Sequence, residues 1–418
     1  MQIVYERVAG IDVGKKIIAV AVRTPGNQPG VRHQQVRKYN TFYQSLTSMV
    51  AWLVAEGVTH VSMEATGVYW RPVFHALCAA DRPLEVLLVN AAHVKNVPGR
   101  KSDALDAAWL AELTECGLLR GSFLPPRQIA ELRELTRYRK KLIEARISEL
   151  QRLGKVLEDA GIKIDSVASA LTTRSARDMI EALIAGERDP AVLADLAHGR
   201  MRAKIADLRL ACAGRFGAQH ALMCGLHLEH IDHLADMIVW LDERIDQACF
   251  PFAAQINLLA TIPGIGERAA QVIISEIGVD MTRFPTAAHL ASWAGLCPGN
   301  NESAGRHRSG RTRKGNAHLC AMLAECAWAA NRTNSYVGAQ FRRFHRRFGV
   351  KGGRKAATAT AHTLIVIIWH VLAENSPYHD LGPDYFTRRL ESTAVRERRL
   401  IRELEALGHT VVLDPTAA

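Results

Sequence analysis

The order of apolar and polar positions divides this chain of 418 residues into an α/β beginning and a helical remainder. Runs rich in β-branched residues predict five strands, at 8–13, 17–22, 35–39, 58–63 and 84–89. Helical apolar spacing predicts three helices among and after them, at 42–56, 69–80 and 103–115. Three strands followed by alternating helices and strands are typical of an α/β domain with mixed strand directions.

Two long segments beyond the double proline at 125–126 have the apolar spacing of helices. The first runs from about 129 to 160 and is rich in leucine. The second has the alternating three- and four-residue spacing of a coiled-coil seam, at Ile231, Leu234, Ile238, Leu241, Ile245 and Ala248. We expect an all-helical middle region in which these helices pair with each other or with a second protomer. An ordinary helix bundle fits the same pattern equally well.

A glycine-rich turn joins two apolar segments in LLATIPGIGERAAQVIISEIG, at 258–278, which is the pattern of a helix-hairpin-helix motif. Gly264 and Gly266 would let the backbone approach a phosphate, and the second helix would point its N-terminal amides at that phosphate. We therefore predict that both glycines bind nucleic acid. A plain αα-hairpin is the alternative interpretation.

These patterns predict four segments: an α/β domain at 1–126, a helical coiled-coil region at 127–254, a mostly helical domain at 255–386 and a charged tail at 387–418. The third segment ends in an apolar helix at about 358–374. The uninterrupted apolar run at 364–369 is far shorter than the roughly 20 residues that span a bilayer. We therefore expect no contact with a membrane. Because no basic and then apolar leader opens the chain, we also do not expect secretion.

The positive charge of the chain is concentrated in one region. Lys and Arg number 53 against 42 Asp and Glu, a net charge of +11, and residues 300–355 hold 13 of the basic and two of the acidic residues. A basic region on an otherwise neutral body predicts contact with a polyanion. We expect five of its residues to bind nucleic acid: Arg306, Arg308, Arg311, Arg313 and Lys314.

Neither the cysteines nor the histidines predict a metal site. The eight cysteines show no paired C-x-x-C spacing, so a zinc site is not expected. His227, His230 and His233 are spaced three apart beside the predicted seam, and we interpret them as solvated residues on its flank.

Carboxylates at three places in the α/β segment form a candidate catalytic set. Asp12 lies in an otherwise apolar strand, where an unpartnered carboxylate is costly to bury, and Glu64 ends another apolar strand. Asp103 and Asp106 are three residues apart and share one face of a helix. Taken singly, each has a structural explanation, such as a favourable helix N-terminal charge for Asp103. Together, four carboxylates can hold two divalent ions, for which oxygen ligands favour Mg²⁺ or Mn²⁺.

The chain resembles the bacterial insertion-sequence transposase family numbered one hundred and ten. Three motifs match its amino-terminal DEDD domain: GIDVGK at 10–15, MEATG at 63–67 and KSDALDA at 101–107. Four match its carboxyl-terminal transposase domain: IPGIG at 262–266, AGLCPG at 294–299, ESAG at 302–305 and GRTRKGN at 310–316. The two matching regions cover roughly half of the chain, and their order is more specific than any single motif.

The resemblance implies a ribonuclease-H-type, RuvC-like fold for the first domain, with Asp12, Glu64, Asp103 and Asp106 as its Mg²⁺ ligands. It also implies a catalytic serine, which maps onto Ser303 and joins covalently to DNA. Many relatives carry Ser-Ser-Gly-Gly where this chain has ESAG, so Ser309 remains a competitor. The resemblance further implies double-stranded DNA at the element ends and target, a non-coding guide RNA, a homodimer or homotetramer, and a place in the bacterial cytoplasm at the nucleoid.

The residues around Ser303 agree with a nucleophilic role. A serine hydroxyl needs a base, a metal or a group of cations to activate it. The nearby arginines and lysine would hold the scissile phosphate and stabilise its added charge. A polar, basic loop that only grips the DNA backbone is the alternative interpretation.

We therefore expect a transposase or recombinase that cuts and rejoins DNA through a serine–DNA link. A hydrolytic RuvC-like nuclease or junction resolvase, in which water attacks, is the first alternative. A nucleic-acid-binding protein on an inactive nuclease fold is the second, although acidic residues at all four positions argue against it. Whether the carboxylates and the serine act in one protomer or across two stays open.

Overall fold

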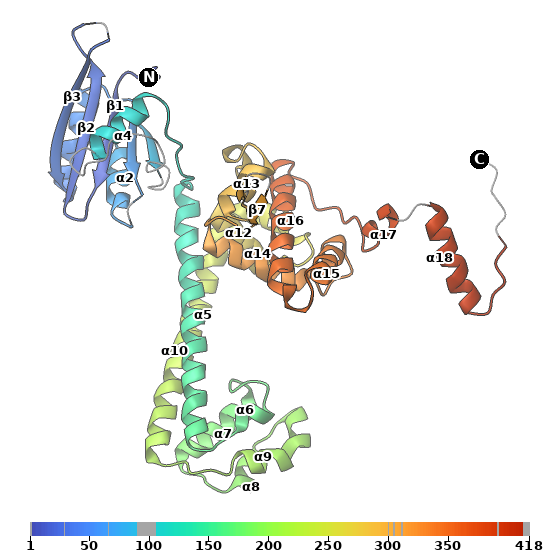
Figure 1. Cartoon of the computed structure of the whole chain (residues 1–418). Helices are drawn as coiled ribbons and strands as arrows, with labels where there is room; N and C mark the ends of the chain where they lie inside the picture. The colour runs from blue at the N-terminus through green and yellow to red at the C-terminus, as the bar shows by residue number, and fades with distance from the viewer. Residues whose placement is uncertain are drawn as a thin grey trace. The chain divides into compact units, whose positions relative to one another are not determined.

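The computed structural model describes residues 2–28, 30–65, 67–89, 106–299, 301–303, 306–310, 312–390 and 393–412. The chain divides into two compact units, Met1–Leu124 and Pro125–Ala418. Figure 1 shows that the first unit contains the large sheet and that the second is predominantly helical. The three later segments predicted from the sequence all lie in the second unit.

A five-stranded sheet in the order β3-β2-β1-β4-β5 forms the first unit. Its strands are β1 (Val8–Val13), β2 (Ile17–Pro25), β3 (Arg32–Asn40), β4 (His60–Glu64) and β5 (Glu85–Val89). The first three strands pair antiparallel, whereas β4 is parallel to β1 and β5 is parallel to β4. All five predicted strands are confirmed. The polar edge strand β3 is longer than predicted because it pairs with β2 along nine residues although little of it is buried.

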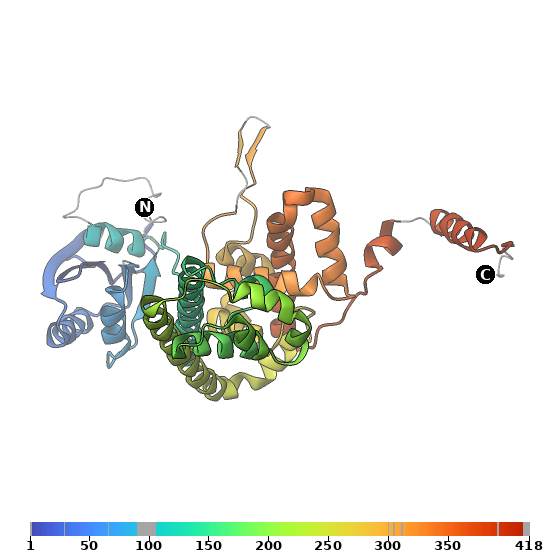
Figure 2. The ribbon, with the colours of Figure 1, turned by 90° about the horizontal axis from the view of Figure 1, so that it is seen from below.

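Helices cover both faces of this sheet (Figures 1 and 2). On one face, Ile11 and Val13 pack with buried residues of α1 (Tyr43–Ala55) and α2 (Trp70–Cys78). On the other face, Val8 packs with Ala107 and Ala111 of α4 (Asp106–Glu115). Alternate residues of β1 therefore face opposite helical layers, as the period of two in a strand requires.

Two long helices, α5 (Arg127–Asp159) and α10 (Ala218–Cys249), pack against each other in the second unit. The seam residues Ile231, Leu234, Ile238, Leu241 and Ile245 are all buried. Arg139 pairs with Asp242 near one end of the pair, and Asp159 lies 3.1 Å from His220 at the other. The helices are therefore antiparallel, and the seam predicted from the sequence buries its apolar residues within the chain.

One of the histidines beside this seam is not solvated as predicted. The Nδ1 atom of His227 lies 2.8 Å from Oε2 of Glu149, and both side chains are largely buried between α5 and α10. Burial raises the pKa of the Glu149 carboxyl. The hydrogen bond with His227 and the charge of Arg152 outweigh that effect, so the pKa lies below its usual range.

Short helices close the far end of the long pair and bury one hydrophobic cluster that includes Leu153, Ile180, Leu193, Leu208 and Phe216. They are α6 (Ile164–Val167), α7 (Arg174–Ala185), α8 (Pro190–Asp195), the 3₁₀ turn η2 (Gly199–Lys204) and α9 (Ile205–Ala211).

The helix α16 (Gly353–Ala373) contacts α11, α13, α14 and α15, and α12 packs against α5, α11 and α14. Their bounds are α11 (Ala253–Ala260), α12 (Glu267–Ile277), α13 (Ala287–Ala294), α14 (Ala317–Ala330) and α15 (Tyr336–Phe348). Three 3₁₀ turns, η3 (Phe250–Phe252), η4 (Met281–Arg283) and η5 (Val350–Gly352), join them. The segment Val350–Ala373 is long and apolar enough to cross a membrane by length and composition, and half of its most apolar window is buried in the protein. The sequence analysis considered only the uninterrupted apolar run at 364–369 and did not predict an apolar segment of this length.

Between α13 and α14 the chain forms a two-stranded ribbon of β6 (Asn301–Ser303) and β7 (Arg306–Ser309). Figure 2 shows this ribbon extending from the neighbouring helices of its unit. The sequence analysis did not predict it, because the residues of these two strands are polar or charged and show no apolar alternation. The helices α17 (Tyr385–Leu390) and α18 (Thr393–Ala406) follow α16.

The seam between α5 and α10 gives the first testable prediction. Leu234 is 5% exposed and packs with Leu142, Ile238 and Leu241. We expect Leu234→Ala to lower the free energy of unfolding by about 2–5 kcal/mol, because it leaves a cavity in this cluster. Denaturant unfolding followed by circular dichroism measures the loss. Leu222→Ala, at a position 58% exposed on the same helix, is the control and should change stability by less than about 0.5 kcal/mol. Equal losses in both variants would contradict the packing described.

Candidate functional site

Asp12 and Glu64 lie at the carboxyl ends of two neighbouring parallel strands. Ile11 of β1 pairs with Met63 of β4, so Asp12 and Glu64 are the next residues along the two strands. Both side chains are half-buried. Parallel strands end at the same edge of a sheet, and this edge therefore carries two of the predicted carboxylates.

Both carboxylates are on the sheet face that α4 covers. Gly10 contacts α4, and Asp12 is two residues further along the same strand. The hydroxyl of Ser62 donates to the carbonyl of Leu110 at 3.3 Å, and Glu64 is two residues beyond Ser62. Because residues two apart in a strand share a face, Asp12 and Glu64 both point toward the layer of α4.

The direction of α4 brings Asp106 to the same end of the sheet. A Cβ atom on Gly10 would overlap the carbonyl oxygen of Ala107, so the start of α4 lies directly against β1. At the other end of the helix, the carbonyl of Glu115 accepts from the amide of Val4, before the start of β1. The helix is thus antiparallel to β1, and its exposed first residue, Asp106, lies at the end of β1 that carries Asp12.

Three of the four predicted metal ligands, Asp12, Glu64 and Asp106, therefore lie at one end and on one face of the sheet. Asp103 is outside the described residues. Within the described part of the chain, no group of three or more His, Cys, Asp or Glu residues is arranged to hold a metal ion. The three described carboxylates therefore share one end of the sheet but do not form a metal-binding group by themselves.

Ser303 is the last residue of β6 and pairs with Arg306, the first residue of β7. Ser309 is at the opposite end of β7 and pairs with Asn301 beside an irregularity in the register. The two candidate nucleophiles are therefore separated along the ribbon, with Ser303 at its far end. Arg308 belongs to β7, and Arg311 is outside the described residues.

Two glycines hold the arms of the ribbon together at its base. Gly295 has a φ of 80°, and a Cβ atom there would lie 2.7 Å from the amide nitrogen of Gly315. A Cβ atom on Gly315 would in turn overlap the carbonyl oxygen of Ala294. The two backbone segments are in direct contact, and the exposed Arg313 and Lys314 lie immediately before this contact. Sequence reasoning noted these glycines only as parts of family motifs.

The buried carboxylate of Glu276 ties this base to the helices around it. Glu276 is fully buried in α12 and accepts two hydrogen bonds from the guanidinium of Arg137, at 2.7 and 2.8 Å. It also accepts a hydrogen bond from the side-chain amide of Asn316 at 2.6 Å. The side-chain oxygen of Asn316 caps α14 by accepting from the amides of His318 and Leu319. The residue that ends the motif at 310–316 is thereby fixed to α12, α14 and α5.

Arg133 completes this cluster, which we call the Glu276 anchor: Glu276, Arg133, Arg137 and Asn316. Arg133 donates to the backbone carbonyls of Ser275 and Glu276, at 3.0 and 2.7 Å. Burial raises the pKa of the Glu276 carboxyl, but the hydrogen bonds from Arg137 and Asn316 and the two positive charges outweigh it. Its pKa therefore lies below the usual range. Sequence reasoning missed Glu276, whose signal is a lone acid among the apolar residues that end α12.

The two glycines of the predicted helix-hairpin-helix turn have different surroundings. Gly264 has a φ of 91°, and a Cβ atom there would lie 2.7 Å from the amide nitrogen of Ala330 in α14. The close packing of α14 is therefore sufficient to require a glycine at this position. Gly266 precedes α12 and has open space around it. The first turn of α12 contains Glu267, whose carboxylate would compete with a phosphate.

Comparison with known proteins adds an independent line of evidence. A family model for DEDD transposases, described as "Transposase", matches residues 9–162, and one described as "Transposase IS116/IS110/IS902 family" matches residues 256–343. The first match includes the carboxylate end of the sheet, and the second includes the ribbon and the Glu276 anchor residues Glu276 and Asn316.

Individual relatives match this chain to different extents. It is 24% identical over 338 residues to y4qE, a candidate transposase of Sinorhizobium fredii, covering 77% of this chain and 71% of the relative. It is 42% identical over 78 residues to the pilin gene-inverting protein of Moraxella bovis, covering 18% of this chain and 24% of that protein. A 43.6 kDa protein of insertion element IS110 from Streptomyces coelicolor is 42% identical over 73 residues, or 17% and 18% of the two chains.

The Glu276 anchor gives a prediction about stability and pH. Because the folded-state pKa of Glu276 is depressed, its charge contributes stability above the unfolded pKa of about 4.3, and this is lost as pH falls through the folded pKa. We expect Glu276→Gln to lower the free energy of unfolding at pH 7 by about 1.5–3 kcal/mol. The difference from wild type should shrink below about pH 4.

Denaturant unfolding of both proteins between pH 3 and pH 8 measures this difference. Glu267→Gln, at an exposed position in the first turn of the same helix, is the matched control and should show little change. A difference between Glu276→Gln and wild type that stays constant across this pH range would show that the ionised carboxylate is not the stabilising group.

Proposed function

The chain belongs to the IS110 family of transposases and is a DNA transposase or recombinase, and we propose that it recombines DNA through a covalent serine–DNA intermediate. The observation that carries this proposal is the ribbon of β6 and β7. It presents Ser303 at the far end of a strand pair whose base the Glu276 anchor and two glycines hold. A nuclease in which water attacks has no need of a serine placed in this way.

In the proposed reaction, the hydroxyl oxygen of Ser303 attacks a phosphorus of the DNA backbone. A phosphorus–oxygen bond to serine forms, the bond to one deoxyribose oxygen breaks, and that oxygen leaves with a proton as a free hydroxyl. The serine proton passes to a base or solvent. Attack by a deoxyribose hydroxyl on the phosphoserine reverses these changes, so strands are rejoined without ATP because the bond energy is kept in the serine link.

Positive charge along this segment would support the step. We propose that Arg306, Arg308, Arg311, Arg313 and Lys314 hold the DNA backbone. Arg306 pairs with Ser303 across the ribbon, and we propose that it offsets the charge that builds up on the attacked phosphate. Gly266, at the open start of α12, is a further proposed backbone contact. Gly264 is also proposed as a backbone contact, on the side of its backbone away from α14.

We propose that Asp12, Glu64, Asp103 and Asp106 hold Mg²⁺ or Mn²⁺. The site would lie at the carboxyl ends of β1 and β4. Carboxylate oxygens are the ligands that these ions prefer. The sheet order with an antiparallel β1–β3 meander and parallel β4 and β5 supports a ribonuclease-H-type, RuvC-like fold. When bound, such an ion would neutralise charge on a phosphate and on the departing oxygen. In this proposal Asp103 would be the fourth ligand beside the other three carboxylates.

Several proposed partners follow from the same function. Double-stranded DNA at the ends of an insertion sequence and at its target would be the substrate, and a non-coding RNA would direct target choice. The concentration of the net charge of +11 in residues 300–355 supports a polyanion at that region. Joining two duplexes would require a homodimer or homotetramer. The pilin gene-inverting relative supports recombination, which we place in the bacterial cytoplasm at the nucleoid.

A denaturing gel tests the serine link. Purified protein is mixed with labelled element-end DNA, its co-purified RNA and Mg²⁺, and wild type is compared with Ser303→Ala. We expect a slowly migrating covalent band with wild type and none with Ser303→Ala, because the variant lacks the attacking oxygen.

Ser309→Ala is the matched control, since it removes a hydroxyl from the other end of the same ribbon, and it should keep the band. A band that persists in Ser303→Ala and disappears in Ser309→Ala would move the nucleophile to Ser309. DNA cleavage without any covalent band, unchanged by both substitutions, would overturn the proposal in favour of a hydrolytic nuclease.

A further inference from the structure

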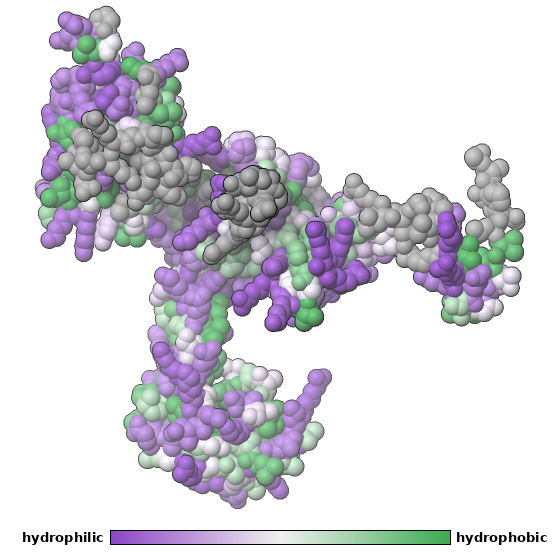
Figure 3. All heavy atoms as spheres, in the orientation of Figure 1, coloured by the Kyte–Doolittle hydropathy of each residue, from purple (hydrophilic) through white to green (hydrophobic). Residues whose placement is uncertain are grey.

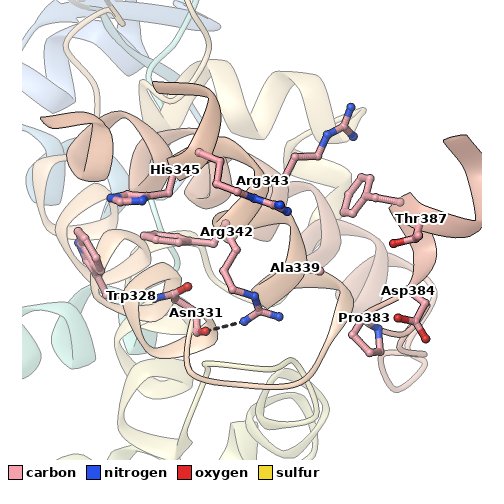
Figure 4. Close-up of a pocket in the computed structure, with 12 residues that line it drawn as sticks. Trp328, Asn331, Ala339, Arg342, Arg343, His345, Pro383, Asp384 and Thr387 are labelled. Atoms are coloured by element: carbon pink, nitrogen blue, oxygen red, sulfur yellow. Dashed lines mark hydrogen bonds between the residues drawn. The ribbon is translucent and has the colours of Figure 1, made fainter. Parts of the chain in front are cut away.

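A cavity of about 900 Å³ lies between the end of α14, the outer part of α15 and the start of α17. Figure 4 shows Trp328 and His345 along one side, Pro383, Asp384 and Thr387 along the other, and Arg342 and Arg343 of α15 between them. This volume is within the usual range of about 300–1,000 Å³ for small-ligand sites. No residue assigned above to DNA cleavage lines it.

An exposed aromatic ring forms one wall of the cavity. Trp328 is 45% exposed, and its ring lies 4.9 Å from that of the buried Phe341. The start of α16 supports the indole from behind, because a Cβ atom on Gly353 would lie 2.9 Å from it. The indole is therefore held in place by packing while a large part of it stays accessible, which suits stacking on a planar ligand.

Arginines give the cavity positive charge in addition to its aromatic wall. Helix α15 carries four arginines and no acidic residue, and Figure 3 shows hydrophilic side chains gathered over it. Arg342 is used in the fold, since it donates to the carbonyl of Asn331 at 2.7 Å. Arg343 stacks over the ring of Phe386, with its guanidinium carbon 4.8 Å from the ring centre. The exposed Arg346 also lines the cavity, and Asp384 is the one carboxylate among the lining residues.

We propose that this cavity binds one unpaired nucleotide of a nucleic-acid strand, with its base on Trp328 and its phosphate at Arg343 and Arg346. This inference rests on the proposed function, which brings DNA and RNA to the chain. An accessible aromatic face beside guanidinium groups is how proteins bind single-stranded nucleic acid without strict sequence preference. A base within a duplex is covered on both faces by its neighbours, so the ligand must be unpaired. A single nucleotide fits the volume, and a duplex does not.

Binding of a fluorescent base analogue tests the proposal. The full-length protein, in buffer with a chelator so that no cleavage occurs, is titrated into an oligonucleotide with one 2-aminopurine at an unpaired position. We expect quenching of the probe as its ring stacks on the indole. Trp328→Ala should abolish the quenching and weaken single-strand binding by roughly five- to a hundredfold. Trp328→Phe, which keeps an aromatic face and the packing on Phe341, should retain most of both.

Matched variants separate the cavity from the rest of the surface. Trp240→Ala removes a tryptophan that is 59% exposed on α10, and it should leave quenching and affinity unchanged. Arg343→Ala with Arg346→Ala should weaken binding and reduce its salt dependence, whereas Arg209→Ala, on the exposed surface of α9, should not. The same oligonucleotide annealed to its complement should bind wild type and Trp328→Ala equally.

Three results distinguish the possible failures. Unchanged quenching and single-strand affinity in both Trp328→Ala and the double arginine variant would overturn the cavity as the site. Free 2-aminopurine nucleotide that binds as tightly as the strand would show that the ligand is a mononucleotide, which also overturns the proposal. Absence of duplex binding by wild type would count against the proposed function alone, because quenching of the single strand would still report the cavity.

Discussion

Glu276 is a carboxylate without solvent contact, and its ionised form is compatible with burial only because three side chains from two other helical elements satisfy it. Arg133 and Arg137 reach it from α5, and Asn316 reaches it from the start of α14. One buried charge therefore sets the relative positions of three helices. The ribbon that carries Ser303 enters α14 through Asn316, so its base takes its position from the same cluster.

Close backbone contacts supply the second constraint on both candidate sites. Gly10 lets α4 lie directly on β1, and this contact brings Asp106 to the end of the strand that holds Asp12. Gly315, at the end of the second arm of the ribbon, lets the backbone lie against Ala294, just before the first arm begins. A side chain at either glycine would separate the two elements by the width of a methyl group. The positions of the carboxylate end of the sheet and of the serine ribbon thus both require a residue without a Cβ atom, which is glycine.

The basic region contains two different kinds of surface. The segment at 306–314 has five basic residues and no Phe, Tyr or Trp in its sequence, which suits the sequence-independent phosphate contacts of a duplex. The cavity beside α15 combines guanidinium groups with the accessible ring of Trp328, which suits an unpaired base. A recombinase that melts or pairs strands would need both kinds of contact, and the two are built from different elements of the second unit.

The sequence by itself determined the elements that have a buried face. The bounds of β1 follow from its apolar run, and the seam at Ile231–Ile245 predicted the face of α10 that packs on α5. It also determined the order of the candidate residues Asp12, Glu64 and Ser303, and hence the family. The spacing of apolar residues along a strand or helix shows which of its faces is buried. This face can therefore be predicted without knowing which element packs against it.

Only the tertiary structure shows the contacts between residues that are far apart in the sequence. Glu276 and Arg137 are 139 residues apart, so no local pattern links the acid to the cation that stabilises it. The ribbon at 301–309 has no apolar alternation, and the partner of His227 is Glu149 of α5, 78 residues away. Gly264 was predicted from its turn, and the contact with α14 that also requires a glycine there was not predicted. In each case the deciding interaction joins segments that come together only on folding. The sequence lists these residues but does not show which of them become neighbours in space.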